Sequence, residues 1–262
     1  MSDSIVLIPT YNEKENIAEM IQTVMALPKD FHLLIIDDNS PDGTAKIVKK
    51  LMPQYEGRLY LEERKGKLGL GTAYIHGFRW ALRRDYEYIF EMDADFSHNP
   101  QDLIRLYEAC ALKGSHMSIG SRYVTGVNVV NWPMSRVMLS YFASHYVRLI
   151  TGMPINDTTA GFKCYHRSVL ETIELDRVRF MGYAFQIEMK FLTWKYGFSI
   201  EEVPIIFTDR TKGESKMSGG IIKEAVLGVI QIKLNSLFRT FRREMPLQPG
   251  LIEADGFNGT NP

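Results

Sequence analysis

Ile5-Val6-Leu7-Ile8 and Leu33-Leu34-Ile35-Ile36 decide the fold of this chain. Each is a short, continuously apolar run, which is typical of a parallel strand covered on both faces of a sheet. Between the two runs, apolar residues recur at helical spacing over 17–25. The N-terminal segment therefore predicts a strand, a helix and a second strand parallel to the first.

The same alternation continues along the chain. Further strands are predicted at 59–61, 88–92, 116–119 and 200–203, and further helices at 44–52, 72–83, 102–112, 135–150 and 184–196. Strands that alternate with helices in this way predict an α/β fold with an open, mostly parallel sheet.

The composition is that of an ordinary globular chain. Of its 262 residues 45% are hydrophobic, and 31 basic side chains balance 31 acidic ones. This excludes a long disordered or fibrous chain, and zero net charge gives no overall attraction for nucleic acid. Cys110 and Cys164 lie far apart, so we expect two buried thiols and no metal knuckle or disulfide framework.

No stretch of the sequence has the character of a targeting or spanning segment. The first residues lack the basic flank and long apolar core of a signal peptide, and no run approaches the ~18 to 20 apolar residues that cross a bilayer. We therefore expect a cytoplasmic protein that does not span a membrane.

Polar clusters follow three of the predicted strands. They are Pro9-Thr10-Tyr11-Asn12-Glu13, Asp37-Asp38-Asn39-Ser40 and Asp93-Ala94-Asp95-Phe96-Ser97-His98. Open α/β sheets bind ligands at the carboxyl ends of their strands, so we expect the three clusters to share one rim.

Two of these clusters have a functional interpretation and a plainer alternative. Asp93 and Asp95 suit a hard divalent cation held against a diphosphate, or else they form a solvated turn. Asp38 suits a ribose or base edge, although the same segment also reads as a turn before a helix. The glycine-rich 66–71 lacks P-loop and dinucleotide spacing, and it suits a close approach of backbone to a nucleotide.

Taken together with strings further along the chain, these clusters resemble the inverting glycosyltransferases of family 2 and, within them, the polyprenol-phosphate (dolichol-phosphate) mannosyltransferases. The further strings are Lys67-Leu68-Gly69-Leu70-Gly71-Thr72-Ala73-Tyr74, Gly120-Ser121-Arg122-Tyr123, Thr159-Ala160-Gly161-Phe162, Tyr183-Ala184-Phe185-Gln186-Ile187-Glu188-Met189 and Asp209-Arg210-Thr211-Lys212-Gly213-Glu214-Ser215-Lys216. The resemblance covers about residues 4–240.

The resemblance implies a GT-A fold, a Rossmann-like nucleotide-diphospho-sugar transferase with a mixed, mostly parallel sheet flanked by helices. It implies inverting transfer of mannose from GDP-mannose to a polyprenyl phosphate. It places Mg²⁺ or Mn²⁺ on Asp93 and Asp95, and catalysis on Asp95, Arg122 and Arg210. The implied binding residues are Pro9, Tyr11, Glu13, Ile36 and Asp38 around guanosine, Asp93, Ala94 and Asp95 at the diphosphate, and Arg122, Arg136, Arg210 and Lys216 at phosphate groups.

One position departs from the pattern of the family. Some members carry a glutamine ligand two residues after the second aspartate, where this chain has Ser97. We expect a water in that place.

The chemistry of such an acceptor agrees with these residues. A polyprenyl phosphate is already an anion, so the reaction needs leaving-group stabilisation and positioning more than a strong base. We therefore expect His98 and Glu188 to have a solvated or structural role and not to act as bases. The alternatives are another donor such as UDP-glucose, or a non-catalytic subunit that binds a nucleotide sugar.

A lipid acceptor requires contact with a membrane surface, and two amphipathic helices suit it. The predicted stripe comprises Ile222, Val226, Val229, Ile230, Leu234, Leu237, Phe238 and Phe241, beside Lys223, Lys233, Arg239, Arg242 and Arg243. Helix 135–150 is a second candidate, and packing on the domain is the alternative for both. We expect a catalytic domain over 1–210, a basic loop and interfacial helix over 211–243, and a flexible tail over 244–262.

Overall fold

A computed structural model describes residues 2–210 and 219–242. Its main sheet has the strand order β3-β2-β1-β4-β7-β5-β8. The strands are β1 (Ser4–Thr10), β2 (His32–Asp37), β3 (Leu59–Glu63), β4 (Tyr88–Glu91), β5 (Met117–Ser121), β7 (Lys163–His166) and β8 (Ile200–Pro204). A second, two-stranded sheet pairs β6 (Val129–Val130) with β9 (Phe207–Thr208). The α/β class and the mostly parallel sheet predicted from the sequence are confirmed.

The register of the sheet follows from its apolar runs. β1 pairs in parallel with β2 on one side, with Ile8 opposite Ile35, and with β4 on the other. β7 is antiparallel to both β4 and β5, so β5 again points the same way as β1. β7 is not predicted from the sequence, because Lys-Cys-Tyr-His is not a continuous apolar run.

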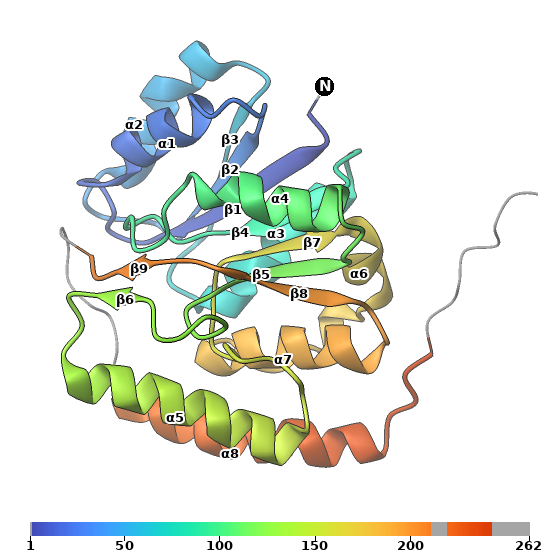
Figure 1. The fold of residues 1–262 in the computed structure, drawn as a ribbon. Helices are drawn as coiled ribbons and strands as arrows, with labels where there is room; N and C mark the ends of the chain where they lie inside the picture. Colours follow the sequence, from blue (N-terminus) through green and yellow to red (C-terminus); the bar gives the residue numbers. More distant parts are fainter. Residues whose placement is uncertain (1, 211–218, 243–262) are drawn as a thin grey trace, which may run out of the picture.

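Helices cover both faces of this sheet (Figure 1). On one face, α1 (Ile17–Met25), α2 (Thr44–Leu51) and α4 (Asp102–Ala111) pack on a core that includes Val6, Ile8 and Phe90. The core of the other face includes residues of α3 (Leu70–Leu82), α6 (Arg167–Thr172) and α7 (Tyr183–Lys195). Short 3-10 turns lie at Met52–Tyr55 and Leu175–Arg177.

A glycine lets α3 approach the sheet closely. A Cβ at Gly77 would lie 2.7 Å from the Ile36 side chain and 2.9 Å from that of Leu7. Any larger residue would push the helix off the strands, because buried side chains leave no free volume. This contact fixes α3 beneath the strand ends that carry the polar clusters.

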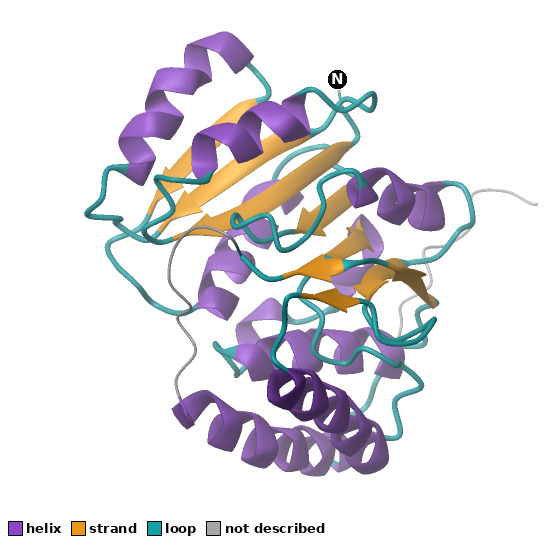
Figure 2. Ribbon diagram, turned by 60° about the vertical axis from the view of Figure 1, so that its left-hand side comes forward, coloured by secondary structure: helices purple, strands orange, loops and turns teal. Residues whose placement is uncertain are grey.

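Two long helices, α5 (Met134–Thr151) and α8 (Gly219–Leu237), lie side by side beyond α7 (Figures 1 and 2). Each buries one edge, with Val147 and Ser144 of α5 and Val229 and Ile232 of α8 inaccessible. Their other sides carry exposed apolar residues. These are Met134, Met138, Leu139, Tyr141, Phe142 and Leu149 on α5, and Val226, Leu227, Ile230, Leu234 and Leu237 on α8, followed by Phe238.

The amphipathic stripe predicted for the C-terminal helix needs two corrections. Val229 is 1% exposed and packs inward, and Phe241 packs on Tyr196 with ring centres 5.2 Å apart, so neither belongs to the exposed apolar side. Lys233 and Arg239 also turn to the protein, where they donate to the Thr151 carbonyl and to Glu174. The predicted loop 211–218 and tail 244–262 lie outside the described residues, as do Lys216 and Arg243, and the side chains of Ile222 and Lys223 are not described. Within 2–210 and 219–242, no helix combines the length and apolar character required to traverse a bilayer.

Candidate active site

The carboxyl ends of β1, β2 and β4 lie next to one another, because these strands are parallel neighbours. Hydrogen bonds join the loops that follow β1 and β2. The Asn12 amide donates to Ser40 Oγ at 3.0 Å, and the Glu13 amide donates to Thr44 Oγ1 at 3.0 Å. The predicted common rim is thus present, and its first two polar clusters form one connected surface.

The two acidic residues after β2 have different partners. Asp37 accepts hydrogen bonds from Thr10 Oγ1 at 2.9 Å and from Ser40 Oγ at 2.6 Å, so it ties the two loops together. Asp38 forms a bidentate ion pair with Arg64, at 2.6 and 2.8 Å, and Arg64 also donates to Thr72. Sequence reasoning missed Arg64, which fixes the carboxylate of Asp38 against the start of α3.

The remaining residues predicted around guanosine differ in whether their side chains are exposed to a nucleotide. Pro9 and the side chains of Tyr11 and Glu13 are partly exposed at the rim, and the Lys67 ammonium lies 5.0 Å from the centre of the Tyr11 ring. The Lys67 contact brings the glycine-rich loop to the same edge. Ile36 is fully buried beneath α3, so only its main chain can contribute to a nucleotide site.

The acidic cluster after β4 is held in a tight turn. Asp95 is 6% exposed and accepts hydrogen bonds from the Ser97 amide at 3.0 Å and from the Ser97 hydroxyl. Phe96 between them has φ 60°, a left-handed conformation that is costly for a bulky residue. Ala94 is buried beside them. Ser97 thus orients Asp95, and the water expected in place of a glutamine ligand stays a prediction.

Asp93 lies at the same turn with 41% of its side chain exposed. Its pKa is raised to about 7, first by desolvation and then by the charges of Asp95, Glu91 and Glu13, while Arg210 lowers it. Crowded carboxylates at a strand end favour a bound cation, because each carboxylate disfavours ionisation of the other. No set of three His, Cys, Asp or Glu ligands occurs in the described parts of the chain. Two carboxylates supplemented by substrate phosphates are, however, a usual way to hold Mg²⁺.

Two arginines reach the rim from distant segments. Arg210 Nη2 lies 2.9 Å from Asp95 Oδ2, and Arg136 Nη1 donates to Asp209 Oδ1 at 2.9 Å. The pairing of β6 with β9 brings the 209–210 segment here, since the Asp209 amide donates to the Val130 carbonyl at 3.0 Å. Arg210 is therefore beside the acidic turn, Arg136 is held by the preceding residue Asp209, and both arginines are partly exposed.

Arg122 has a different environment. Its guanidinium forms a bidentate ion pair with Asp157, at 2.7 and 2.6 Å, and also donates to Thr159 Oγ1 at 2.8 Å. Only 9% of the side chain is exposed, and it lies among the rings of Tyr123, Trp132 and Phe207. Its predicted phosphate contact stays a prediction, and the structure adds a buried carboxylate partner that the sequence analysis did not identify.

Both titratable residues expected to be structural are enclosed by protein. His98 is 3% exposed, stacks on Phe162 with ring centres 4.9 Å apart, and has its pKa lowered to about 4 by burial. Glu188 accepts the amides of Arg179 and Phe180, and burial raises its pKa. These contacts support structural roles for the two groups.

A buried ion pair lies under the acidic turn, and sequence reasoning missed it. Glu91, at the end of β4, accepts from Lys163 Nζ at 3.0 Å, Tyr165 Oη at 2.9 Å and Gln186 Nε2 at 2.9 Å. Lys163 also contacts Gln186 Oε1, and burial lowers its pKa. Glu91 itself was the available signal in the sequence. An acidic residue within an apolar strand indicates a buried carboxylate, and a buried carboxylate requires a partner.

Comparison with known proteins agrees with this geometry. The family described as Glycosyl transferase family 2 matches residues 5–174. Polyprenol monophosphomannose synthase of Mycolicibacterium smegmatis is 46% identical over 87% of this chain and 86% of that protein. Undecaprenyl-phosphate mannosyltransferase of Micrococcus luteus is 42% identical over 92% of this chain and 98% of that protein. The resemblance stated from the sequence is confirmed.

Solved structures of low identity share the fold. Mannosyl-3-phosphoglycerate synthase from Rubrobacter xylanophilus, 15% identical, has a TM-score of 0.65 over 95% of this chain and 78% of that one. A mannosyltransferase from Pyrobaculum calidifontis in complex with GDP-Man and Mn²⁺, 14% identical, has a TM-score of 0.54 over 90% of this chain and 74% of that one. The GT-A fold is thereby confirmed. The chain is a glycosyltransferase that belongs to glycosyl transferase family 2.

Proposed function

We propose that this enzyme transfers mannose from GDP-mannose to a polyprenyl phosphate with inversion, forming a polyprenyl-phosphate-mannose. The observation that carries the proposal is the joint presence, on one rim, of the Asp93 and Asp95 carboxylates and the Arg136 and Arg210 guanidinium groups. The sequence relatives, whose names describe polyprenol-phosphate mannosyl transfer, supply the donor sugar and the acceptor class.

A divalent cation, Mg²⁺ or Mn²⁺, fits the acidic turn. Asp93 and Asp95 would hold it together with the diphosphate, and when bound it would neutralise charge that develops on the leaving GDP. Ser97 keeps the Asp95 carboxylate oriented through two hydrogen bonds. A related solved structure contains Mn²⁺ and GDP-Man, which is consistent with this donor and metal.

The nucleoside would lie along the ends of β1 and β2. Asp38 offers a carboxylate whose position is fixed by Arg64, and the Tyr11 ring, with the Lys67 ammonium 5.0 Å from its centre, follows the neighbouring strand β1. Each Asp38 oxygen keeps a lone pair beside its hydrogen bond to Arg64, and such a lone pair would accept an N–H of the base or a ribose hydroxyl.

The acceptor needs positive charge and alignment more than a base. Its phosphate oxygen is already a nucleophile, so the chain must bring two anionic groups together and orient them for in-line attack at the anomeric carbon. Arg210 lies next to Asp95 and Arg136 next to Asp209, and both arginines retain exposed surface, so they can donate hydrogen bonds to a phosphate. Lys216 belongs to the same proposed set, although it lies outside the described residues.

Contact with a membrane surface would use the outer sides of α5 and α8. Phe142 and Leu149 on α5 are 58% and 83% exposed, and Phe238, directly after the adjacent helix α8, is 92% exposed. Apolar side chains gathered on one side of a protein suit the interfacial zone of a bilayer. We propose peripheral attachment at the cytoplasmic face of a membrane, with the helices presenting the acceptor phosphate to the rim.

The deciding experiment follows radiolabelled mannose. Purified protein, GDP-[³H]mannose, a polyprenyl phosphate and Mg²⁺ or Mn²⁺ should yield a labelled lipid that extracts into organic solvent and is released by mild acid, and EDTA should prevent its formation. Parallel reactions with labelled UDP-glucose show which of the two nucleotide sugars is the donor. Nucleotide-sugar binding without labelled lipid from any donor would refute transfer and would favour a non-catalytic subunit.

A further inference from the structure

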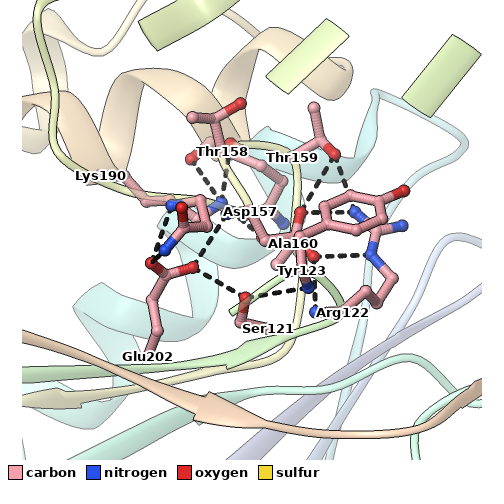
Figure 3. A network of polar contacts seen from close by, with 11 residues as sticks. Ser121, Arg122, Tyr123, Asp157, Thr158, Thr159, Ala160, Lys190 and Glu202 are labelled. Atoms are coloured by element: carbon pink, nitrogen blue, oxygen red, sulfur yellow. Dashed lines mark hydrogen bonds and ion pairs between the residues drawn. The ribbon is translucent and has the colours of Figure 1, made fainter. Parts of the chain in front are cut away.

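The loop that joins α5 to β7 is held by two charged side chains, the partly buried Glu202 and the fully buried Lys190 (Figure 3). Glu202, on β8, accepts from the Asn156 amide at 2.7 Å, Asn156 Nδ2 at 2.9 Å, the Asp157 amide at 2.9 Å and Ser121 Oγ at 2.7 Å. A carboxylate has four lone-pair sites, and these four donors use all of them. Glu202 therefore fixes the amide side of the loop.

Lys190 holds the carbonyl side of the same loop. Its ammonium is fully buried on α7 and donates to the carbonyls of Thr158 at 3.0 Å, Ala160 at 2.6 Å and Gln186 at 3.3 Å. Three N–H donors thus meet three acceptors, which is the full capacity of a lysine. No regular helix or strand supports 156–160, so these two side chains replace backbone pairing there.

Two residues of the held loop, Asp157 and Thr159, contact Arg122. Asp157 accepts from the Arg122 amide at 3.0 Å and from two guanidinium nitrogens, while Thr159 Oγ1 accepts from Nη2 at 2.8 Å. Asp157 is itself fully buried. A shift of the loop would therefore move the guanidinium, because three of these four bonds end on one rigid carboxylate.

We propose that Glu202 and Lys190 are positioning residues that keep the guanidinium of Arg122 fixed beside the rim. The proposal rests on the function proposed above and on the prediction from the sequence that Arg122 supplies positive charge to a phosphate group, which it would do while paired with Asp157. Arg122 lies 5.5 Å from the Trp132 ring, and the Arg136 guanidinium lies 4.1 Å from the same ring, so the fixed charge is next to the acceptor side of the rim. A small displacement of the Arg122 guanidinium would lower kcat, since catalysis depends on the alignment of the reacting groups.

The test compares Glu202→Gln with Glu201→Gln. Glu201 is the adjacent residue on β8, and its carboxylate pairs with Lys113 at 2.7 Å near the surface, away from the loop. We expect Glu202→Gln to lower kcat by about tenfold or more while the Kd for GDP changes by less than about twofold. Glu201→Gln should keep the wild-type kcat, and Lys190→Met should behave as Glu202→Gln does.

A double-mutant cycle separates positioning from a general loss of structure. If Glu202 acts through Arg122, adding Glu202→Gln to Arg122→Lys should lower kcat by less than about twofold beyond Arg122→Lys alone. If the double variant instead lost kcat by the product of the two single-variant factors, the proposal would be overturned. A folded Glu202→Gln enzyme with wild-type kcat would overturn it as well. Should that variant not fold, Ser121→Ala, which removes one of the four bonds to Glu202, takes its place in the cycle.

One measurement does not depend on activity. The NMR signal of the Arg122 Nε–H, assigned with Arg122→Lys, reports on its hydrogen bond to Asp157. It should shift or broaden in Glu202→Gln and stay in place in Glu201→Gln. If the wild-type protein transferred no mannose, the proposed function would fail, and an unchanged Nε–H signal in Glu202→Gln would still separately refute the positioning role.

Discussion

The substitution Asp157→Asn tests how much of the fold depends on the buried ion pair beneath the rim. The carboxylate of Asp157 is fully buried and accepts three hydrogen bonds from Arg122, at 3.0, 2.7 and 2.6 Å. Removing one partner of such a pair leaves the other charge buried without compensation, at a cost of roughly 3–5 kcal/mol. Asparagine keeps one acceptor oxygen, so we expect a loss of about 3 kcal/mol in the free energy of unfolding.

The measurement is urea unfolding followed by circular dichroism, together with Tm. For a chain of this length a loss of 3 kcal/mol corresponds to a fall in Tm of about 6–12 °C. Asp176→Asn is the matched control, because Asp176 pairs with Arg79 at the surface and its side chain is 90% exposed. That pair should contribute less than about 1 kcal/mol. A loss of stability no larger in Asp157→Asn than in the control would refute the reasoning.

The effect of Asp157→Asn also has a predicted pH dependence. Burial alone would raise the pKa of Asp157, but the charge and hydrogen bonds of Arg122 outweigh burial, so the pKa lies below its usual value. Stability from this group is therefore present above the unfolded pKa of about 3.9 and is lost as pH falls through the lower folded value. The stability difference between wild type and variant should be full at neutral pH and shrink in strong acid.

Three further predictions concern the metal, the membrane and the glycine-rich loop. Asp95→Ala should lower mannose transfer by about a thousandfold or more and abolish Mn²⁺ binding measured by electron paramagnetic resonance, with the fold retained; normal metal-dependent transfer would contradict the metal site. Phe142→Asp with Leu149→Asp should reduce sedimentation with liposomes, whereas Leu112→Asp, 75% exposed at the end of α4, should not. Gly71→Ala should cost about 1–3 kcal/mol in unfolding free energy, because its Cβ would lie 2.8 Å from the Phe180 carbonyl and the Phe185 ring. Gly66→Ala, with open space around it, should be neutral.

The sequence predicts the rim well because the residues that indicate it are neighbours along the chain. An apolar strand followed directly by Asp93 and Asp95, or by Asp37 and Asp38, specifies both the strand and the edge where its polar residues emerge. The helices were predictable for the same reason, since 3.6-residue periodicity is read from neighbouring positions. Parallel neighbours then bring the clusters together without any further information.

The partners beneath the rim could not be predicted, because they come from distant segments. Asp157 lies 35 positions from Arg122, and Gln186 lies 95 from Glu91. Nothing in local periodicity identifies such pairs, since each member looks like an isolated polar residue in an apolar context. β7 was missed for a related reason: its buried lysine is tolerated only because Glu91 and Gln186 face it.

Burial divides the cations of the site into two kinds, and this division bears on which of them bind substrate. The pair of Arg122 with Asp157 is 9% and 0% exposed, so breaking it to bind a phosphate would cost several kcal/mol. The side chains of Arg136 and its partner Asp209 are 30% and 29% exposed, and pairs of that kind contribute only about 0–1 kcal/mol. Arg136 can therefore exchange its carboxylate for a phosphate at little cost, whereas Arg210 is paired with Asp95, whose side chain is only 7% exposed. We infer that Arg136 moves between partners during the reaction while Arg122 stays fixed, so Arg136→Lys should raise the acceptor KM and Arg122→Lys should lower kcat.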